Sequence, residues 1–250
     1  MKITVPELAW SPYGAIVITS VLIGFTVVIC SLRKSGVAKQ TVFYTCLLTA
    51  VCTIVSSVMF TVLQSNDLRS IGFSGLGGAV GMIGGVLISG LIIRDKPDIV
   101  MATFVATAPL MYGLAKFGCL FAGCCHGKSY DGPFAVVYHG KMEGSYFPAQ
   151  IIDMVIFIMI FITGMILIHK MKNKTAAIYI ILLILIPVRF LLEYLRSYHE
   201  GTLISSGQVT VLIAGAAALI LVTVWKGVMK IGKQHDDAAG SGNGFNGAQD

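Results

Sequence analysis

The stretch TAAIYIILLILIPVRFLLEYLR, residues 175–196, decides the fold class of this chain. It carries no charged side chain before Arg189, and about 20 apolar residues are enough to cross a bilayer as a helix. The whole chain of 250 residues shares this bias, since 56% of it is hydrophobic and 12% charged. A soluble domain has roughly 25% charged residues. The composition therefore excludes a soluble globule and a disordered chain, and it predicts a polytopic membrane protein.

Six further apolar stretches predict an all-α protein with seven transmembrane helices. Backbone groups in lipid must be satisfied within their own segment, so each stretch is expected to be helical. The predicted spans cover residues 12–32, 41–63, 73–93, 99–118, 148–168, 175–195 and 207–225. They define one transmembrane domain over residues 1–234, with an outer connector at 119–147. Residues 235–250 lack apolar periodicity, so a disordered cytoplasmic tail is expected there.

Lysine and arginine residues in the loops predict the orientation of the helices. Cytoplasmic loops carry an excess of these residues, and the larger set in this chain flanks one end of the predicted spans. The set consists of Arg33, Lys34, Lys39, Arg94, Lys96, Lys170, Lys172, Lys174, Lys226, Lys230 and Lys233. The N-terminus and the connector are therefore expected outside, and the C-terminus in the cytoplasm. The net charge of +6 reflects this orientation, and no nucleic-acid partner is predicted.

A group of charged residues near the outer end of the sixth span marks a candidate site. Ionisable side chains at membrane depth cost about 2.5–3.5 kcal/mol each on insertion scales. Arg189, Glu193 and Arg196 follow each other at i, i+4 and i+7, which places them on one helical face. A carboxylate between two guanidinium groups can stay ionised, and the surplus positive charge suits a phosphate. The alternative is a salt-bridged helix end whose arginines snorkel to the interface.

The connector begins with KFGCLFAGCCHGK, residues 116–128, which combines positive charge, small residues and thiols. Three cysteines and His126 could ligate a soft metal. However, the adjacent Cys124 and Cys125 are awkward chelators and their spacing is uncommon for zinc, so no metal is predicted. A disulfide and the packing of a re-entrant turn are the other interpretations. The chain contains no P-loop, H-E-x-x-H or G-x-S-x-G motif, and no cofactor is predicted.

Two further segments have both a packing and a functional interpretation. The segment SGLGGAVGMIGG, residues 74–85, places Gly77 and Gly78 in small-xxx-small patterns. Such patterns permit close helix packing, and they also let a lipid approach the backbone. The segment PAQIID begins the fifth span and puts Gln150 and Asp153 on one face. The carboxylate of Asp153 is favoured by the helix dipole, or it belongs to the site.

The order of these segments resembles the prolipoprotein diacylglyceryl transferase family over most of the chain. The segments that carry the resemblance are LGGAVG (76–81), KFGCLFAGC (116–124), PAQIID (148–153), RFLLEYLR (189–196) and Gly207-Gln208. In the same order, they are similar to the family's H-G-G-x-x-G, R-x-G-N-x-x-N-G-E, P-S-Q-L-Y-E, R-F-x-x-E-x-x-R and G-Q. The chain departs from that pattern at Leu76, Lys116, Cys119, Ala122 and Cys124. It therefore looks like a divergent member of the family.

The resemblance implies an enzyme of the bacterial cell membrane whose active site faces outward. Its expected reaction moves a diacylglyceryl group from phosphatidylglycerol, a membrane lipid, to the thiol of the cysteine in a prolipoprotein signal peptide. The candidates for catalysis are Arg189, Glu193, Lys116 and His126, with His139 as a weaker candidate for the base. The candidates for substrate binding are Arg196, Gly77, Gly78, Gly118, Cys119, Gln150 and Asp153. The alternatives are a paralogue with another lipid or thiol substrate or with no activity, and a transporter or metal-handling membrane protein.

Overall fold

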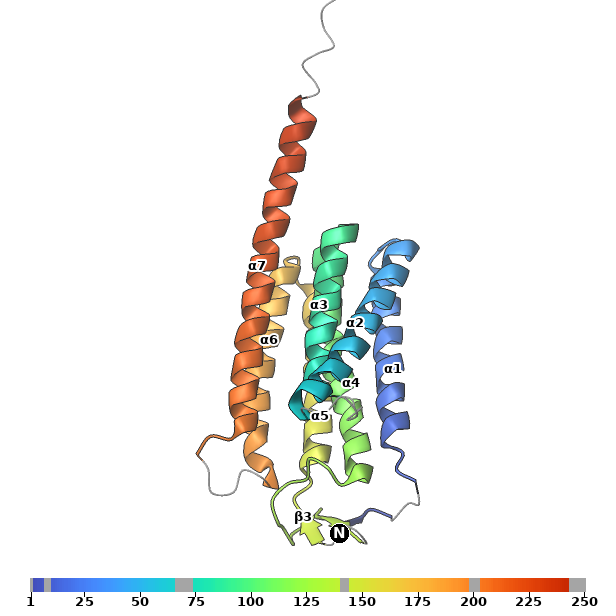
Figure 1. Ribbon diagram of the computed structural model, residues 1–250, viewed down its shortest axis with the longest axis vertical. Helices are drawn as coiled ribbons and strands as arrows, with labels where there is room; N and C mark the ends of the chain where they lie inside the picture. The colour runs from blue at the N-terminus through green and yellow to red at the C-terminus, as the bar shows by residue number, and fades with distance from the viewer. Residues whose placement is uncertain (1, 7–9, 66–73, 140–143, 198–202, 243–250) are drawn as a thin grey trace, which may run out of the picture.

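Seven long helices run along one axis in the computed structural model, which describes residues 2–6, 10–65, 74–139, 144–197 and 203–242 (Figure 1). The helices are α1 (Tyr13–Lys34), α2 (Lys39–Ser65), α3 (Gly75–Ile93), α4 (Pro97–Ala122), α5 (Ala149–Lys170), α6 (Lys174–Leu192) and α7 (Ser206–Gly242). They correspond in order to the seven stretches expected from the sequence. The helical class is therefore confirmed.

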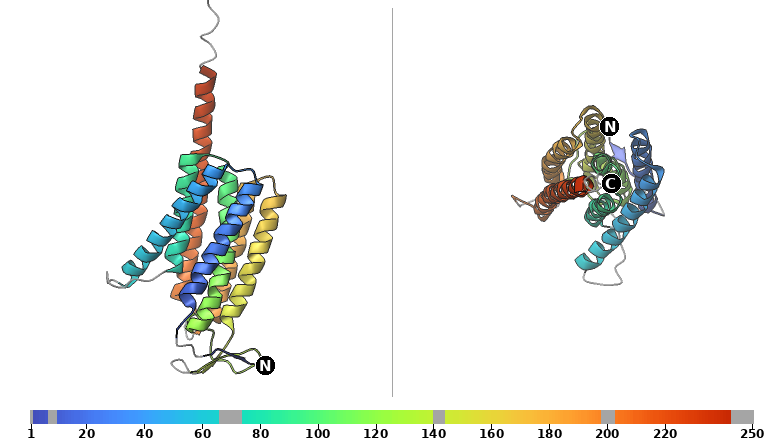
Figure 2. Two further views of the ribbon diagram at one scale, coloured as in Figure 1. Left: turned by 90° about the vertical axis from the view of Figure 1, so that its right-hand side faces the viewer. Right: turned by 90° about the horizontal axis from the view of Figure 1, so that it is seen from above.

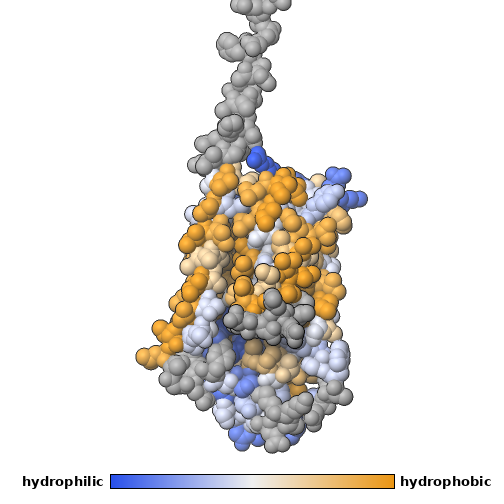
Figure 3. Space-filling view, in the orientation of Figure 1, coloured by the Kyte–Doolittle hydropathy of each residue, from blue (hydrophilic) through white to orange (hydrophobic). Residues whose placement is uncertain are grey.

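Six of the helices are long and apolar enough to cross a membrane, so the chain is a multi-pass membrane protein. The exception is α3, whose apolar part, Gly77–Ile93, is shorter. The surface of the molecule agrees with this assignment. Figure 3 shows a broad apolar band around the middle of the bundle, with hydrophilic residues gathered toward its ends. The seventh span and the orientation of the termini remain predictions.

A small sheet lies at the end of the bundle that carries the N-terminus, and the all-α prediction missed it (Figure 1). The strand β1 (Ile3–Thr4) pairs in parallel with β2 (Val136–Tyr138), which pairs antiparallel with β3 (Gly144–Tyr146). The strands are two or three residues long, which is too short for an alternating pattern to be recognised. The sheet ties the N-terminal segment to the connector between α4 and α5.

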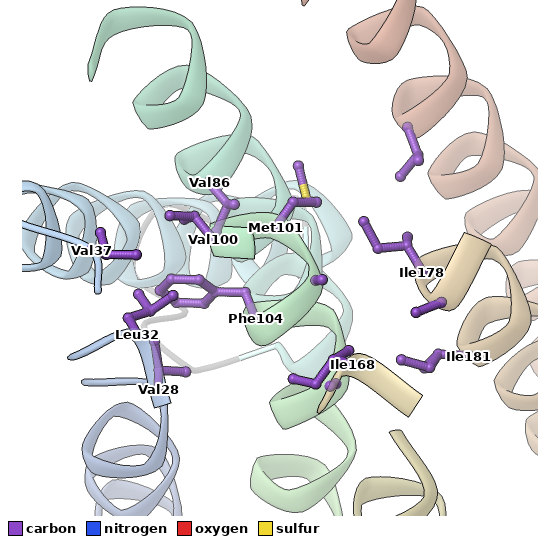
Figure 4. Packing of buried hydrophobic residues seen from close by; sticks show 14 of the residues in the cluster. Val28, Leu32, Val37, Val86, Val100, Met101, Phe104, Ile168, Ile178 and Ile181 are labelled. Carbon is purple, nitrogen blue, oxygen red and sulfur yellow. The ribbon is translucent and has the colours of Figure 1, made fainter. Parts of the chain in front are cut away.

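Helix α4 lies at the centre of the bundle. Within its apolar stretch 56% of the residues are buried, against at most 33% in the other candidate spans. It packs against α1, α3, α5 and α6. Phe104 of α4 lies in the core beside Val28 and Leu32 of α1, and Ile181 of α6 belongs to the same cluster (Figure 4). A polar side chain of α4, such as Lys116 near its C-terminal end, is therefore surrounded by protein.

Helices α2 and α3 form a closely packed pair, and α2 leans away from the other helices toward its C-terminal end (Figure 2). A β-carbon at Gly77 would lie 2.5 Å from the carbonyl oxygen of Ser56 on α2. A β-carbon at Gly81 would clash with the carbonyl oxygen of Cys52. Glycine is thus required at both positions for the two helices to approach this closely.

Helix α7 continues beyond its predicted span to Gly242. The backbone of residues 235–242 is therefore helical where a disordered tail was predicted. This extension contains no proline, and a helix that has already formed adds one hydrogen bond for each further residue. Residues 243–250 of the predicted tail lie outside the described residues.

Candidate functional site

Charged side chains of three helices meet at the end of the bundle that carries the sheet. Lys116 lies six residues before the end of α4, and Asp153 lies four residues after the start of α5. With a rise of about 1.5 Å per residue, these positions are about 9 and 6 Å inside the helix ends. Arg189 belongs to the last turn of α6. Ionisable groups at such depth mark a functional site by default.

Asp153 pairs with two cations. Its Oδ2 accepts a hydrogen bond from Nη2 of Arg196, and Nζ of Lys116 lies 3.8 Å from the same oxygen. The side chain of Asp153 is fully buried, and those of Lys116 and Arg196 are 7% and 1% exposed. One carboxylate therefore compensates two buried cations, which leaves a net charge of +1 in this group. These pairings favour the site interpretation of Asp153 over a helix-dipole role.

Arg189 and Glu193 form the ion pair expected from their i, i+4 spacing. The side chain of Glu193 is 1% exposed, whereas that of Arg189 is 22% exposed. A β-carbon at Gly207 would clash with the carboxylate of Glu193, so this glycine leaves room for the carboxylate beside the first turn of α7. The N-terminus of a helix stabilises a negative charge. Glu193 is thereby held by both an arginine and a helix end.

Arg196 does not continue the helical face of the other two charged residues, contrary to the sequence-based expectation. Helix α6 gives way to a 3-10 turn over Glu193–Leu195, and Arg196 is extended, with φ −78° and ψ 146°. Its guanidinium donates to Asp153 and to the carbonyl oxygen of Cys125. Its backbone forms an antiparallel bridge with Gly127. These partners come from distant parts of the chain, and they draw Arg196 out of the helix.

Tyr112 links the two groups of charges, and sequence reasoning missed it. Nζ of Lys116 lies 4.7 Å from the centre of the Tyr112 ring, and Cζ of Arg189 lies 5.9 Å from it. Both distances are within the roughly 6 Å of a cation–π contact. The ring is supported by Phe157, with 4.5 Å between ring centres. The i, i+4 spacing of Tyr112 and Lys116 on α4 is the signal that could have found it.

Gln150 fixes the connector to the helix bundle. Its Nε2 donates to the carbonyl oxygen of Cys124 at 3.0 Å and to the hydroxyl oxygen of Tyr138 at 3.1 Å. The Tyr138 hydroxyl in turn donates to the carbonyl oxygen of Leu120 at 3.0 Å. Burial raises the pKa of Tyr138 to about 12, so the hydroxyl keeps its proton at neutral pH. Gln150 therefore belongs to the site as a positioning residue.

The thiols of Cys119, Cys124 and Cys125 converge at the end of α4. Their sulfur atoms all lie within 4.8 Å of one another. Cys125 adopts a left-handed backbone conformation, with φ 58°. Hydrogen bonds from the other two thiols lower the pKa of the Cys125 thiol, the nearby cations lower it further, and burial opposes them. The three cysteines are free thiols in this structure, and they adjoin the cation group because the Cys125 carbonyl binds Arg196.

His126 lies beside this cluster on the connector. Its Nδ1 is 3.0 Å from the carbonyl oxygen of Gly127, and its ring centre lies 4.4 Å from that of Tyr146. A carbonyl oxygen only accepts, so Nδ1 carries the proton and Nε2 is the basic atom of the neutral ring. The backbone N–H of Ser197 donates to the His126 carbonyl at 3.3 Å. His126 is therefore tied to the same segment as Arg196. His139, the weaker candidate, is exposed after β2.

The three glycines predicted to bind substrate lie against neighbouring helices. A β-carbon at Gly78 would meet Thr53 of α2 at 3.7 Å, and one at Gly118 would meet Tyr13 of α1 at 3.2 Å. A β-carbon at Gly77 would likewise meet atoms of α2. Helix packing requires glycine at Gly77, leaves little room for a β-carbon at Gly118, and would accommodate one at Gly78. Substrate binding by these glycines stays a prediction. The structure thus brings together seven of the predicted residues: Lys116, Cys119, Gln150, Asp153, Arg189, Glu193 and Arg196.

A reciprocal cap holds the start of α7, where Glu193 is bound. The backbone N–H of Ser205 donates to Oε1 of Gln208 at 2.9 Å, and the backbone N–H of Gln208 donates to Oγ of Ser205 at 3.2 Å. This arrangement is a capping box, which satisfies two N–H groups of the helix end. The Gly207-Gln208 pair singled out from the sequence therefore has a structural explanation, because it shapes the place where the Glu193 carboxylate lies.

Comparison with known proteins identifies the family. The family model of prolipoprotein diacylglyceryl transferase matches residues 1–224 of the 250. A search of the curated proteins found no match. The matched range includes the buried charges, the connector and the first turns of α7. The chain belongs to the prolipoprotein diacylglyceryl transferase family and is thus a multi-pass membrane transferase of lipoprotein biosynthesis.

Proposed function

We propose that this transferase moves the diacylglyceryl group of phosphatidylglycerol to the cysteine thiol of a prolipoprotein signal peptide, at the outer face of the membrane. The bond between the glyceryl carbon and the phosphate oxygen breaks, and its electron pair leaves with glycerol phosphate. The thiol loses its proton and its sulfur forms a thioether with the same carbon. The observation that carries this proposal is the group of two buried cations, Lys116 and Arg196, and the partly buried Arg189, joined through Asp153 and Tyr112.

The charges suit a leaving phosphate. A phosphodiester carries one negative charge, and the released phosphate monoester gains a second. Cations fixed in a poorly solvated site therefore stabilise the transition state more than the bound lipid. Arg189 is the most exposed of the three cations, so we assign it the phosphate. Lys116 contacts the same Tyr112 ring as Arg189, so its charge adds to the positive potential around Arg189.

Three polar atoms near these cations support a headgroup with hydroxyls. Oε1 of Gln150, Oδ1 of Asp153 and Nε of Arg196 are buried without a hydrogen-bond partner among the described residues. A buried polar group without a partner costs about 1–3 kcal/mol. The two oxygens accept hydrogen bonds and Nε donates one. The glycerol headgroup of phosphatidylglycerol offers hydroxyl donors to the oxygens, and its phosphate offers an acceptor to Nε.

The acceptor thiol needs a base, because the thiolate is the nucleophile. His126 is the residue we propose for this step, with Nε2 as the accepting atom. Its Nδ1 is held by the Gly127 carbonyl, which fixes the tautomer in which Nε2 is basic. Its backbone carbonyl accepts from the N–H of Ser197, and the next residue, Gly127, forms a bridge with Arg196. The segment that carries the proposed base thus adjoins Arg196 of the cation group.

Complementation tests the proposed function directly. The chain is expressed in a bacterium depleted of its own diacylglyceryl transferase, and a reporter lipoprotein is analysed by mass spectrometry. The expected result is a reporter that gains one diacylglyceryl group. Arg189→Ala should abolish the gain, whereas Arg33→Ala, an exposed arginine at the opposite end of the bundle, should preserve it. An unmodified reporter despite normal expression of the wild-type chain would favour a paralogue with another substrate or no activity.

A further inference from the structure

The three converging thiols at the end of α4 have no part in the proposed transfer so far. We propose that Cys119, Cys124 and Cys125 bind a thiophilic divalent ion of the zinc class, as three thiolate ligands that leave a fourth position open. The sequence alone favoured no metal, because two of the cysteines are adjacent in the chain. The structure overturns that objection, since all three sulfur atoms reach the same place.

The distances between the sulfur atoms fit such an ion. A zinc–sulfur bond is about 2.3 Å long, so two thiolates at a tetrahedral ion are about 3.8 Å apart. The three sulfur atoms lie within 4.8 Å of one another. Side-chain rotation that moves each sulfur atom by about 1 Å or less therefore brings the three thiolates to zinc-binding distances, without movement of a helix. Three protein ligands and an open fourth position are typical of catalytic zinc sites.

The backbone explains how adjacent cysteines can face one ion. Gly123 ends α4 in a left-handed conformation, with φ 67°, and Cys125 is also left-handed, with φ 58°. These two residues turn the chain back toward Cys119 in the last turn of α4. A left-handed residue with a β-carbon costs about 1–2 kcal/mol. Backbone strain of this kind concentrates at functional sites, and here the strained residue is Cys125, which carries one of the three thiols.

Neighbouring residues hold the ligand loop in place. The carbonyl oxygen of Cys124 accepts from Nε2 of Gln150 at 3.0 Å, and that of Cys125 accepts from Arg196. Both donors are buried. Metal sites depend on such outer partners to orient their ligands. These two contacts order the loop through its carbonyl groups. The Cys124 thiol donates a weak hydrogen bond to the Cys119 carbonyl at 3.9 Å, and it would give up this contact on binding an ion.

The charge of the surroundings favours an anionic metal site. Three thiolates and a divalent ion carry a net charge of −1. The adjoining group of Lys116, Arg196 and Asp153 carries +1, and the Arg189–Glu193 pair beyond it is neutral. Opposite charges at short range stabilise each other strongly in a poorly solvated site. The site thus offers the ligands and the electrostatic environment that a zinc thiolate centre requires.

An ion here would have a role in the transfer, and this step rests on the proposed function. The acceptor cysteine would occupy the fourth position, because a thiol that coordinates zinc is deprotonated outright. Its proton would pass to solvent, the sulfur would attack the glyceryl carbon, and glycerol phosphate would leave with the electron pair of the broken bond. The ion keeps its oxidation state throughout, so no oxidant or reductant is needed.

Metal binding is measured on the full-length protein, purified in detergent with its thiols reduced. Zn²⁺ is titrated in competition with a chelator, and Co²⁺ is used as a coloured substitute whose absorption reports thiolate ligands. We expect one ion per chain and a thiolate-to-cobalt absorption band. The matched control replaces the other three cysteines, as Cys30→Ala, Cys46→Ala and Cys52→Ala together, and it should bind as the wild type does.

Two variants separate ligand loss from misfolding. Cys124→Ser should weaken Zn²⁺ binding by more than the roughly 10–100-fold loss that follows changes to outer partners. Gln150→Ala removes only an outer contact, and it should weaken binding within that range while the cobalt absorption band persists. Binding by the reduced Cys124→Ser protein that matches the wild type would overturn the proposed site. So would a disulfide between two of the three cysteines, trapped in cells before purification.

The transfer reaction distinguishes the metal site from the proposed function. Zinc-loaded and chelator-treated protein are compared for diacylglyceryl transfer to a cysteine peptide. Loss of transfer on removal of zinc, with recovery when zinc is restored, supports the role of the ion. Equal transfer by both forms would overturn that role and leave the proposed function standing. Zinc binding without transfer by either form would contradict the proposed function and leave the metal site standing.

Discussion

Asp153 determines the arrangement of the buried charges, because it alone among the described residues pairs with both Lys116 and Arg196. Through Arg196 it also reaches the carbonyl oxygen of Cys125 and thus the thiol cluster. Asp153 is therefore the shared partner of the two buried cations. Arg189 and Glu193 form a separate pair in which only Arg189 is partly exposed, and Tyr112 connects the two groups through its ring.

Asp153→Asn should destabilise the folded protein. The change leaves Lys116 and Arg196 as buried cations without a counter-charge, and breaking a buried pair from one side costs about 3–5 kcal/mol. Asp98→Asn is the matched control, because Asp98 is exposed in the first turn of α4 and contributes at most about 1 kcal/mol through the helix dipole. Denaturant unfolding in detergent measures the free energy of unfolding of both variants. Equal stability of the two variants would show that Asp153 does not compensate the cations.

Arg189→Lys tests whether the guanidinium fork, as well as the charge, is needed. Removing one preorganised donor from a developing negative charge lowers turnover by about 10²–10³-fold. Lysine keeps the charge but loses the paired N–H groups that match a phosphate. We therefore expect a smaller loss for Arg189→Lys than for Arg189→Ala, with the turnover number measured on reconstituted protein. If both variants turned over at the wild-type rate, Arg189 would not be the residue that binds the phosphate.

At the scale of elements, apolar stretches of about 20 residues were enough to predict the helices, and contacts distant in sequence decided the rest. Arg196 was expected on the face of a helix, yet Asp153 and Cys125 draw it into an extended conformation. Cys124 and Cys125 were judged awkward chelators because they are adjacent, yet the left-handed residues Gly123 and Cys125 bring their thiols together. Local patterns carry no information about such partners.

The α2–α3 pair offers a direct test of packing in the bundle. A β-carbon at Gly81 would clash with the backbone of Cys52, whereas one at Gly84 would have no atom within 4 Å. Gly81→Ala should therefore push the helices apart and destabilise the protein by about 1–3 kcal/mol, the usual range for overpacking. Gly84→Ala should be neutral or stabilising by up to about 1 kcal/mol. Thermal unfolding in detergent compares them, and the same shift for both variants would contradict this packing.

At the scale of the whole molecule, the site and the basic loops occupy opposite ends of the bundle. Lys116, Arg189 and the connector lie at the end that carries the sheet, and the loops after α1, α3 and α5 lie at the other end (Figure 1). The sequence predicted this separation from its loop charges, because each span reverses the direction of the chain. The charge group itself could be predicted only in part, since Tyr112 and the roles of Asp153 and Gln150 depend on how the helices pack.

The orientation of the chain in the membrane remains to be measured. The positive-inside rule places the basic end and the C-terminus in the cytoplasm, so the site should face outward. A C-terminal fusion to a fluorescent protein that folds only in the cytoplasm should be fluorescent, and a fusion to a phosphatase that folds only outside should be inactive. The opposite pair of results would place the site on the cytoplasmic face and contradict the proposed access for exported prolipoproteins.

Reconstitution in defined liposomes measures the transfer with a lipid donor of known composition. Purified protein is placed in phosphatidylglycerol vesicles with a peptide that contains one cysteine, and mass spectrometry follows the peptide and the released headgroup. We expect one diacylglyceryl group added to the thiol for each glycerol phosphate released, and no product with Arg189→Ala. No product from folded wild-type protein, or equal product from the wild type and Arg189→Ala, would contradict this expectation.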